Sequence, residues 1–246
     1  MAVTDTALTS TALTETFRVI DLLGVFANAV LGGVLARKER LDPVGFAALA
    51  SVSGLGGGLI RDTLLQRGTP VALVDYAYIL TALAGAAVAF VLDLEGGVWD
   101  CGFPVIDALA LGCWASAGAQ KTLGFGLGWL PALLLGTLTA VGGGAVRDIV
   151  LRRIPEIFGG NTLYATSALL ASGVMVAAYD AGHVTLGLVL STLVGAGLTL
   201  LARWRRWQLP EANPWRPRRP VVRRPARRAR GRTVRRRAGS RRTRRR

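Results

Sequence analysis

The chain has 246 residues, of which 51% are hydrophobic, and it carries a formal net charge of +15. A mean hydropathy of +0.41 combined with that charge excludes an ordinary soluble globular protein. The charge lies at one end: residues 203–246 contain 20 arginines and one acid, whereas the rest of the chain contains 10 basic and 14 acidic side chains. The sequence therefore describes an apolar, mildly acidic body with a basic tail.

Seven segments are apolar over about the 20 residues that a membrane-spanning helix needs. Short connections rich in proline, glycine and charge separate them, and helices end at such residues. The predicted fold class is therefore an all-α integral membrane protein with seven transmembrane helices. In chain order the predicted spans are residues 17–36, 43–66, 71–92, 103–123, 127–151, 162–179 and 184–202.

The charges flanking the spans predict the orientation in a cell (inner) membrane. Residues 1–16 lack the pattern of a cleavable signal peptide, so we expect the first span to act as the insertion signal. Excess Lys and Arg marks cytoplasmic segments, so the basic tail predicts a cytoplasmic C terminus. Seven spans then predict an N terminus on the outside.

The tail, residues 203–246, has too few apolar side chains to build a core and is predicted to be disordered. We expect it to attract the anionic headgroups of membrane lipids and to show no specific nucleic-acid binding. An alternative hypothesis makes the tail a nucleic-acid-binding arm and the membrane part its anchor, because the same charge attracts phosphates.

The body of the chain contains an internal repeat. The sequence FRVID at 17–21 recurs as FPVID at 103–107, and GGGLIRD at 56–62 recurs as GGGAVRD at 142–148, each 86 residues further on. Each copy holds three spans, an odd number, so the second copy enters the membrane in the opposite direction. We predict two inverted three-helix repeats, residues 17–93 and 103–180, followed by a seventh helix at 184–202.

Three successive glycines occur in each repeat, although each costs about 1 kcal/mol of helix propensity relative to alanine. In one interpretation the helix kinks there, and freed carbonyl oxygens line a pore and coordinate a dehydrating cation. In the other, the glycines only let two helices approach closely. Matched copies in opposed helices favour the pathway. The predicted ion-pathway residues are Gly56, Gly57, Gly58, Gly142, Gly143 and Gly144, with the hydroxyls of Ser53 and Thr139 on the same helix faces.

Charged side chains follow the glycines in both repeats, and ionisable residues inside a membrane are usually paired. We expect one contact between Asp21 and Arg61 and a second between Asp107 and Arg147. Two roles remain open, namely conduction or gating, and ion pairs that only hold helices together. The same two roles apply to Asp62 and Asp148.

Lys121 stands where the repeat has Leu35. One interpretation is a lysine that extends to the lipid headgroups. The other is a positive charge at the external mouth of the pore that regulates cation entry.

The sequence predicts that the protein is not an enzyme. It has a single histidine, His183, two cysteines without metal-ligand spacing, and no glycine loop followed by a lysine for nucleotide binding. We expect no cofactor and no metal site. The expected bound species are a permeant K⁺ or Na⁺ and lipid.

The doubled Gly-Gly-Gly-x-x-Arg-Asp motif, the seven-span plan and the aspartates of the first and fourth spans resemble the prokaryotic trimeric intracellular cation channels. The resemblance covers about residues 17–202. It implies a homotrimer with a K⁺ and Na⁺ pore in each protomer, between glycine-kinked second and fifth spans. Domains of this family are also labelled glycine transporters, so the alternative is a secondary transporter of glycine or another small amino acid. The basic tail lies outside the family pattern.

Overall fold

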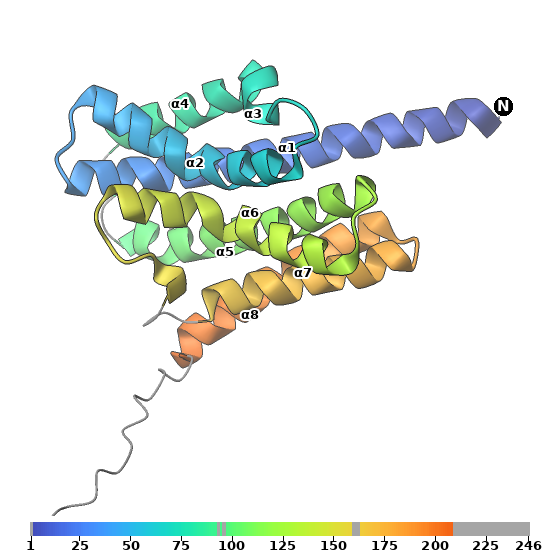
Figure 1. The fold of residues 1–246 in the computed structure, drawn as a ribbon. Helices are drawn as coiled ribbons and strands as arrows, with labels where there is room; N and C mark the ends of the chain where they lie inside the picture. Colours follow the sequence, from blue (N-terminus) through green and yellow to red (C-terminus); the bar gives the residue numbers. More distant parts are fainter. Residues whose placement is uncertain (1, 93, 95–96, 159–162, 209–246) are drawn as a thin grey trace, which may run out of the picture. The chain divides into compact units, whose positions relative to one another are not determined.

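The computed structural model describes residues 2–92, 94, 97–158 and 163–208, and every regular element in these ranges is a helix. The long helices lie side by side, with their axes along one common direction (Figure 1). In chain order the elements are α1 (Ala2–Lys38), α2 (Pro43–Leu65), α3 (Val71–Val74), α4 (Tyr76–Val91), α5 (Gly97–Gly124), α6 (Trp129–Val150), the 3-10 helix η1 (Glu156–Phe158), α7 (Tyr164–Asp180) and α8 (Val184–Arg205).

Five helices are long and apolar enough to cross a membrane: Arg18–Lys38 of α1, α2, Cys101–Gly124 of α5, α6 and α8. They correspond to the first, second, fourth, fifth and seventh predicted spans, with ends that differ by up to three residues. The other two predicted spans correspond to α4 and α7, which have 16 and 17 residues, fewer than the roughly 20 that cross a bilayer core. The all-helical membrane fold is thus confirmed, with five candidate spans in the described residues.

The third predicted span, residues 71–92, is divided in two at Asp75. The Asp75 side chain accepts the N–H of Ala77 at 3.0 Å and so caps the start of α4. The same carboxylate accepts the Nε–H of Arg18 at 2.7 Å. Because this aspartate serves as a helix cap and ion-pair partner, one continuous helix across the segment was a wrong expectation.

Two helices extend beyond their predicted ends. Helix α1 begins at Ala2, so residues 2–16 of the predicted N-terminal segment 1–16 are helical and continuous with the first span. That segment contains no glycine or proline to end a helix. Helix α8 continues to Arg205, three residues into the predicted tail; residues 209–246 lie outside the described part of the chain.

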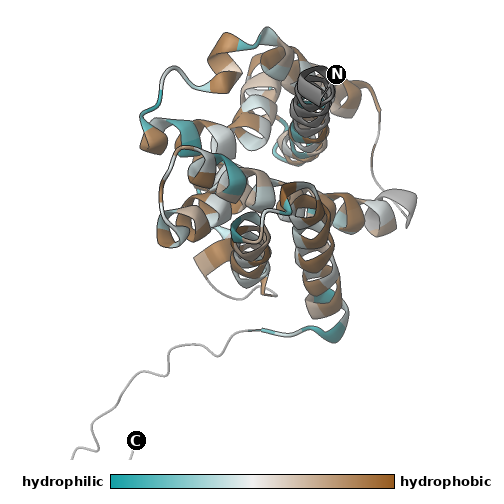
Figure 2. Ribbon diagram, turned by 90° about the vertical axis from the view of Figure 1, so that its right-hand side faces the viewer, coloured by the Kyte–Doolittle hydropathy of each residue, from teal (hydrophilic) through white to brown (hydrophobic). Residues whose placement is uncertain are grey.

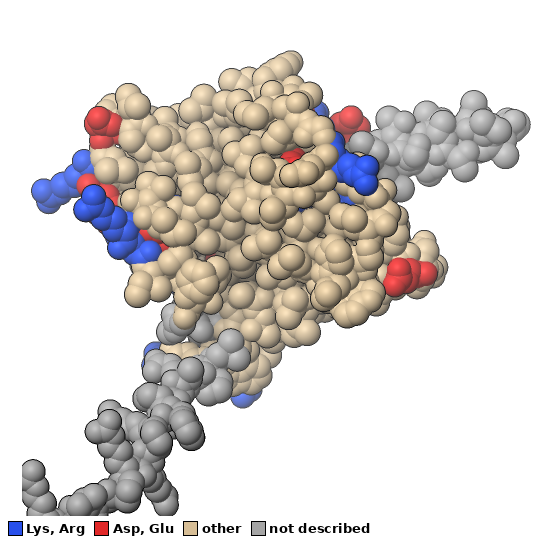
Figure 3. Space-filling view, in the orientation of Figure 1, with Lys and Arg blue, Asp and Glu red and all other residues tan. Residues whose placement is uncertain are grey.

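The outside of the helix bundle is apolar. Large side chains such as Leu80, Val91, Leu134 and Leu193 are more than half exposed, and the hydropathy colouring shows apolar residues along the helices (Figure 2). On the face in Figure 3, charged side chains gather at the two ends of the helices and leave an uncharged band between them. This distribution suits a molecule whose middle is surrounded by lipid.

Candidate functional site

The two glycine motifs meet where α2 crosses α6. A Cβ built on Gly57 would lie 2.1 Å from the carbonyl oxygen of Thr139, and one built on Gly143 would lie 2.3 Å from that of Ser53. The two contacts are related by the 86-residue repeat. Four residues further along α2, from Ser53 to Gly57, the contact in α6 moves back by four residues, from Gly143 to Thr139. The two helices are therefore antiparallel and cross with two-fold symmetry.

These contacts account for the glycines at the crossing. Cβ atoms do not approach backbone atoms to such distances, so only glycine permits this separation of the helices. Gly56 and Gly142 also face the opposite helix, with 3.1 and 3.3 Å between a built Cβ and the nearest backbone atom across the crossing. Both α2 and α6 are α-helical through their glycines. The structure thus gives Gly57 and Gly143 the close-approach role.

The third glycine of each motif is different. A Cβ on Gly58 would have only Arg61 Nη2 nearby, at 3.8 Å, and one on Gly144 would have only Arg147 nearby, with Nη2 at 3.7 Å. Each of these glycines lines a cavity. The motif therefore divides into two positions that join the helices and one that faces open space.

Ser53 and Thr139 are buried at the crossing, with 0% and 2% exposure. The Thr139 hydroxyl donates to the carbonyl oxygen of Leu135 at 2.5 Å. The Ser53 hydroxyl has no hydrogen-bond partner among the described residues. Both predicted hydroxyls thus lie beside the glycines. The Ser53 hydroxyl can still form a hydrogen bond to another group, whereas the Thr139 proton is already donated within its own helix.

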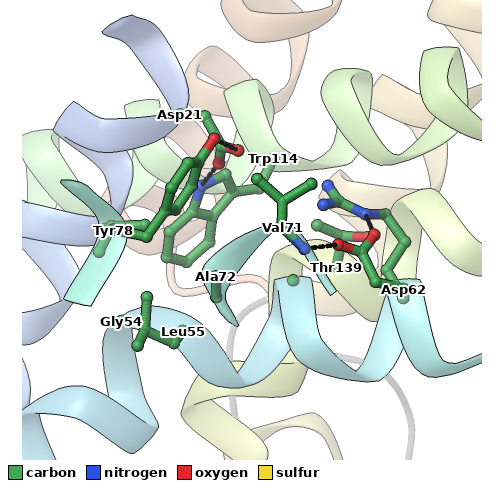
Figure 4. A pocket seen from close by; sticks show the side chains of 12 residues that line it. Asp21, Gly54, Leu55, Asp62, Val71, Ala72, Tyr78, Trp114 and Thr139 are labelled. Carbon is green, nitrogen blue, oxygen red and sulfur yellow. Dashed lines mark hydrogen bonds and ion pairs between the residues drawn. The ribbon is translucent and has the colours of Figure 1, made fainter. Parts of the chain in front are cut away.

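One cavity lies beyond the crossing toward the C-terminal end of α2, and we call it the Asp21 cavity. Its enclosed part has a volume of about 20 Å³. A wider mouth of about 350 Å³ shares Asp21, Arg61, Val71 and Tyr78 with it. Figure 4 shows the aromatic rings of Tyr78 and Trp114 closing around Asp21, with Asp62 on the other side of the chamber.

The second cavity lies toward the C-terminal end of α6, on the other side of the crossing, and we call it the Asp107 cavity. Its volume is about 150 Å³. Its lining repeats that of the enclosed part of the Asp21 cavity, 86 residues apart. The matching pairs are Asp21 and Asp107, Gly54 and Ala140, Leu55 and Val141, Gly58 and Gly144, Arg61 and Arg147, Asp62 and Asp148, Val71 and Ile157, and Tyr78 and Tyr164.

The aspartates of the first and fourth spans accept hydrogen bonds from tyrosines. Asp21 accepts from the Tyr78 hydroxyl at 2.8 Å and from Trp114 Nε1 at 3.1 Å. Asp107 accepts from the Tyr164 hydroxyl at 3.0 Å. Each of the two tyrosine bonds joins residues 57 positions apart, so the repeat conserves this contact.

The predicted pairing of Asp21 with Arg61 was wrong. The Arg61 side chain turns to its neighbour in sequence and donates from Nε to Asp62 at 2.8 Å, with both groups buried. Asp21 is instead satisfied by its two aromatic donors. In the second repeat, among the described residues, Arg147 donates to Asp148 at 2.9 Å and not to Asp107.

Lys121 joins the first of these pairs. Its Nζ lies 2.8 Å from Asp62 Oδ1, and its side chain is 28% exposed. Asp62 also accepts the N–H of Val71 at 3.0 Å, so one carboxylate connects α2, α3 and α5. Lys121 lines the mouth of the Asp21 cavity, which favours the pore-mouth interpretation over a lysine that extends to lipid.

Sequence reasoning missed two cavity residues that break the repeat. Trp114 lines the Asp21 cavity, and Asn28 occupies the equivalent position in the Asp107 cavity. A third residue, Arg203, reaches the Asp107 cavity from α8, which has no counterpart in the repeat. The offset alone could have paired Trp114 with Asn28, but it gave no sign that these side chains point inward.

The repeat is also found by comparison with known proteins. A family model described as "Glycine transporter" matches the chain twice, at residues 18–93 and 104–180. A UPF0126 membrane protein of Deinococcus radiodurans is 36% identical over 170 residues, which are 69% of this chain and 79% of that protein. The UPF0126 inner membrane protein YadS of Escherichia coli K12 is 33% identical over 195 residues, 77% of this chain and 92% of that protein.

Solved structures share the fold. A structure described under "Structural basis for conductance through TRIC cation channels" has a TM-score of 0.74 and 31% identity, and the match covers 80% of this chain and 97% of that one. The TRIC trimeric intracellular cation channel orthologue from Rhodobacter sphaeroides gives a TM-score of 0.71 and 29% identity, over 77% and 98%. With one family model matching both repeats, the chain belongs to the glycine transporter family of membrane proteins, and its fold is that of the prokaryotic TRIC channels.

Proposed function

We propose that the protein is a channel for the monovalent cations K⁺ and Na⁺, with one pore in each protomer between α2 and α6. The observation that carries the proposal is the pair of repeat-related cavities that approach the same glycine crossing from opposite ends. A two-fold site between inverted repeats is where membrane transport proteins bind and pass their substrates. The similar TRIC structures, described as cation channels, support the choice of ion.

The chemistry of the path suits a cation. Carboxylates of Asp21, Asp62, Asp107 and Asp148 stand at its two ends, and carbonyl oxygens of Ser53 and Thr139 lie at its narrowest part. Such oxygens can replace part of the hydration shell of K⁺ or Na⁺. Since α2 and α6 are in backbone contact at Gly57 and Gly143, we expect the helices to separate there when ions pass.

We further propose the seven-span topology, with α4 and α7 as the third and sixth spans and with two inverted three-helix repeats followed by α8. The short helices can cross a locally thinned bilayer beside longer neighbours. The basic tail favours a cytoplasmic C terminus and an external N terminus. The inner-membrane location given for the Escherichia coli relative supports the same location here.

A homotrimer is proposed because the Rhodobacter sphaeroides orthologue is described as trimeric. Lipids are the other partners we propose, with anionic headgroups at the arginines of residues 203–246. No cofactor and no catalytic step enter this function.

A second candidate is the transport of glycine or a similar small amino acid. The description of the family model favours it, and so does the mouth of the Asp21 cavity. There Lys121 and Arg61 could face a substrate carboxylate, while Asp21 and Asp75 could face its ammonium group. This candidate predicts alternating access instead of a continuous pore.

Two measurements on the same purified protein separate the candidates. In planar bilayers with a K⁺ gradient, a channel gives discrete unitary currents that reverse near the K⁺ equilibrium potential. In proteoliposomes, a transporter gives saturable uptake of labelled glycine. Unitary currents without saturable uptake support the channel, and saturable uptake without unitary currents contradicts it.

A further inference from the structure

The chambers next to the glycine crossing have largely repeat-related linings but different volumes. The inner chamber of the Asp21 cavity, behind its wider mouth, measures about 20 Å³, and the Asp107 cavity measures about 150 Å³. One water molecule needs about 10–15 Å³ by this kind of measure. The first chamber thus has room for about one water molecule, and the second for several.

The residue that fills the smaller chamber is Trp114. Its side chain is 4% exposed and lines the enclosed part of the cavity. Its Nε1–H donates to Asp21 at 3.1 Å, and the Tyr78 hydroxyl donates to the other oxygen of the same carboxylate. The indole is therefore held across the chamber by a partly buried, charge-assisted hydrogen bond.

The equivalent position in the larger chamber is Asn28, whose side-chain amide donates to the carbonyl of Gly24, one helical turn earlier in α1, at 3.3 Å. The residue that packs against the indole also differs between the repeats. A Cβ on Gly24 would lie 2.6 Å from Trp114 Nε1, so the indole requires glycine there. The equivalent position in the second repeat is Ala110.

We propose that Trp114 is the gate of the Asp21 half of the pathway, and that Asp21 positions it. The inference rests on the proposed passage between α2 and α6. In the described conformation the indole leaves no room for a hydrated cation between the mouth of the cavity and Gly58. When the indole leaves this place, the inner chamber of the Asp21 cavity takes on the larger volume of its repeat partner.

Accessibility of single cysteines tests the gate without needing ion flux. The exposed Cys101 and the buried Cys113 are replaced by Ser and Ala. Gly58→Cys then reports on the Asp21 cavity and Gly144→Cys on the Asp107 cavity. Both sites have room for a side chain, with no neighbouring atom closer than 3.7 Å to a built Cβ. Each is labelled in proteoliposomes with a membrane-impermeant trimethylammonium methanethiosulfonate, applied to one side at a time.

The Trp114→Asn variant should raise the labelling rate at Gly58→Cys by about tenfold or more, as expected when a state populated at roughly 0.1–10% becomes the main one. The rate at Gly144→Cys should not change. Trp114→Phe keeps an aromatic ring of smaller size and loses the N–H donor to Asp21, so its labelling rate should lie between those of the unmodified gate and Trp114→Asn.

A reciprocal variant tests the gate even if the Trp114→Asn protein fails to fold. Ala110→Gly with Asn28→Trp transfers the tryptophan and its glycine to the other cavity, and labelling at Gly144→Cys should then slow by a similar factor. Unchanged labelling at Gly58→Cys in folded Trp114→Asn, or at Gly144→Cys in the reciprocal variant, would overturn the gate. Faster labelling without unitary currents in planar bilayers would instead keep the gate and reject the channel function.

Discussion

Gly57 of α2 and Thr139 of α6 touch through their backbones, with 2.1 Å between a Cβ built on the glycine and the threonine carbonyl oxygen. The same contact, between Gly143 and Ser53, is formed by the second repeat at 2.3 Å. Because both helices are α-helical through their glycines, the role of these glycines is to let α2 and α6 approach each other closely. A substitution there should therefore act on the packing of the helices and not on a kink.

We expect Gly57→Ala to destabilise the protein by about 1–3 kcal/mol or more, the usual cost of overpacking a well-packed site. Gly58→Ala is the matched control, since its Cβ meets nothing closer than 3.8 Å. Thermal unfolding in one detergent measures the difference. Equal unfolding temperatures for the two variants would mean that α2 and α6 can accommodate a methyl group at the crossing with little loss of stability.

The fold class followed from the sequence because apolar runs of membrane length are a strong signal, and both repeats were visible as an offset of 86 residues. The division at Asp75 was hidden, since one helix-capping carboxylate hardly changes the hydropathy of a 20-residue window. The extension of α1 to Ala2 was also missed, because the first 16 residues are too polar to be part of an apolar membrane-spanning segment.

The site was predicted less completely. The first two glycines of each motif meet at one crossing together with Ser53 and Thr139, whereas Gly58 and Gly144 face the cavities. The partner of Arg61 was wrong because the sequence shows which charges share a depth, but not which rotamer brings two of them together. Trp114 was overlooked because an aromatic residue in an apolar span has no pattern that distinguishes a cavity wall from a lipid-facing surface.

A double-mutant cycle can test the pairing of Asp21. We expect Asp21→Asn and Tyr78→Phe to be coupled by about 1.5–3 kcal/mol, the range for hydrogen bonds to charged groups. Asp21→Asn and Arg61→Gln should show much weaker coupling, because Arg61 is paired with Asp62. Unfolding free energies of the four proteins in each cycle decide the matter. A stronger coupling to Arg61 than to Tyr78 would restore the ion pair that the sequence first suggested.

Lys121→Gln tests the electrostatics of the cavity mouth. Under the proposed orientation, removal of this ammonium group lowers the local positive potential, so inward cation current should increase. The increase should be larger at low salt, because the screening length is about 30 Å at 0.01 M and 10 Å at 0.1 M. Single-channel recordings at the two salt concentrations measure it. A current that does not change across this range would remove Lys121 from the mechanism of ion entry.

The central claim, that ions pass between α2 and α6, is tested most directly by recording unitary K⁺ currents while the cysteines of Gly58→Cys and Gly144→Cys are modified with the trimethylammonium reagent. The native exposed Cys101, which does not line either cavity, serves as the control in a protein with Cys113→Ala. We predict that the reagent reduces the unitary current of each variant from one side only, that the two sides are opposite, and that the control is unaffected. Complete modification of both positions with no change in unitary current would contradict the account.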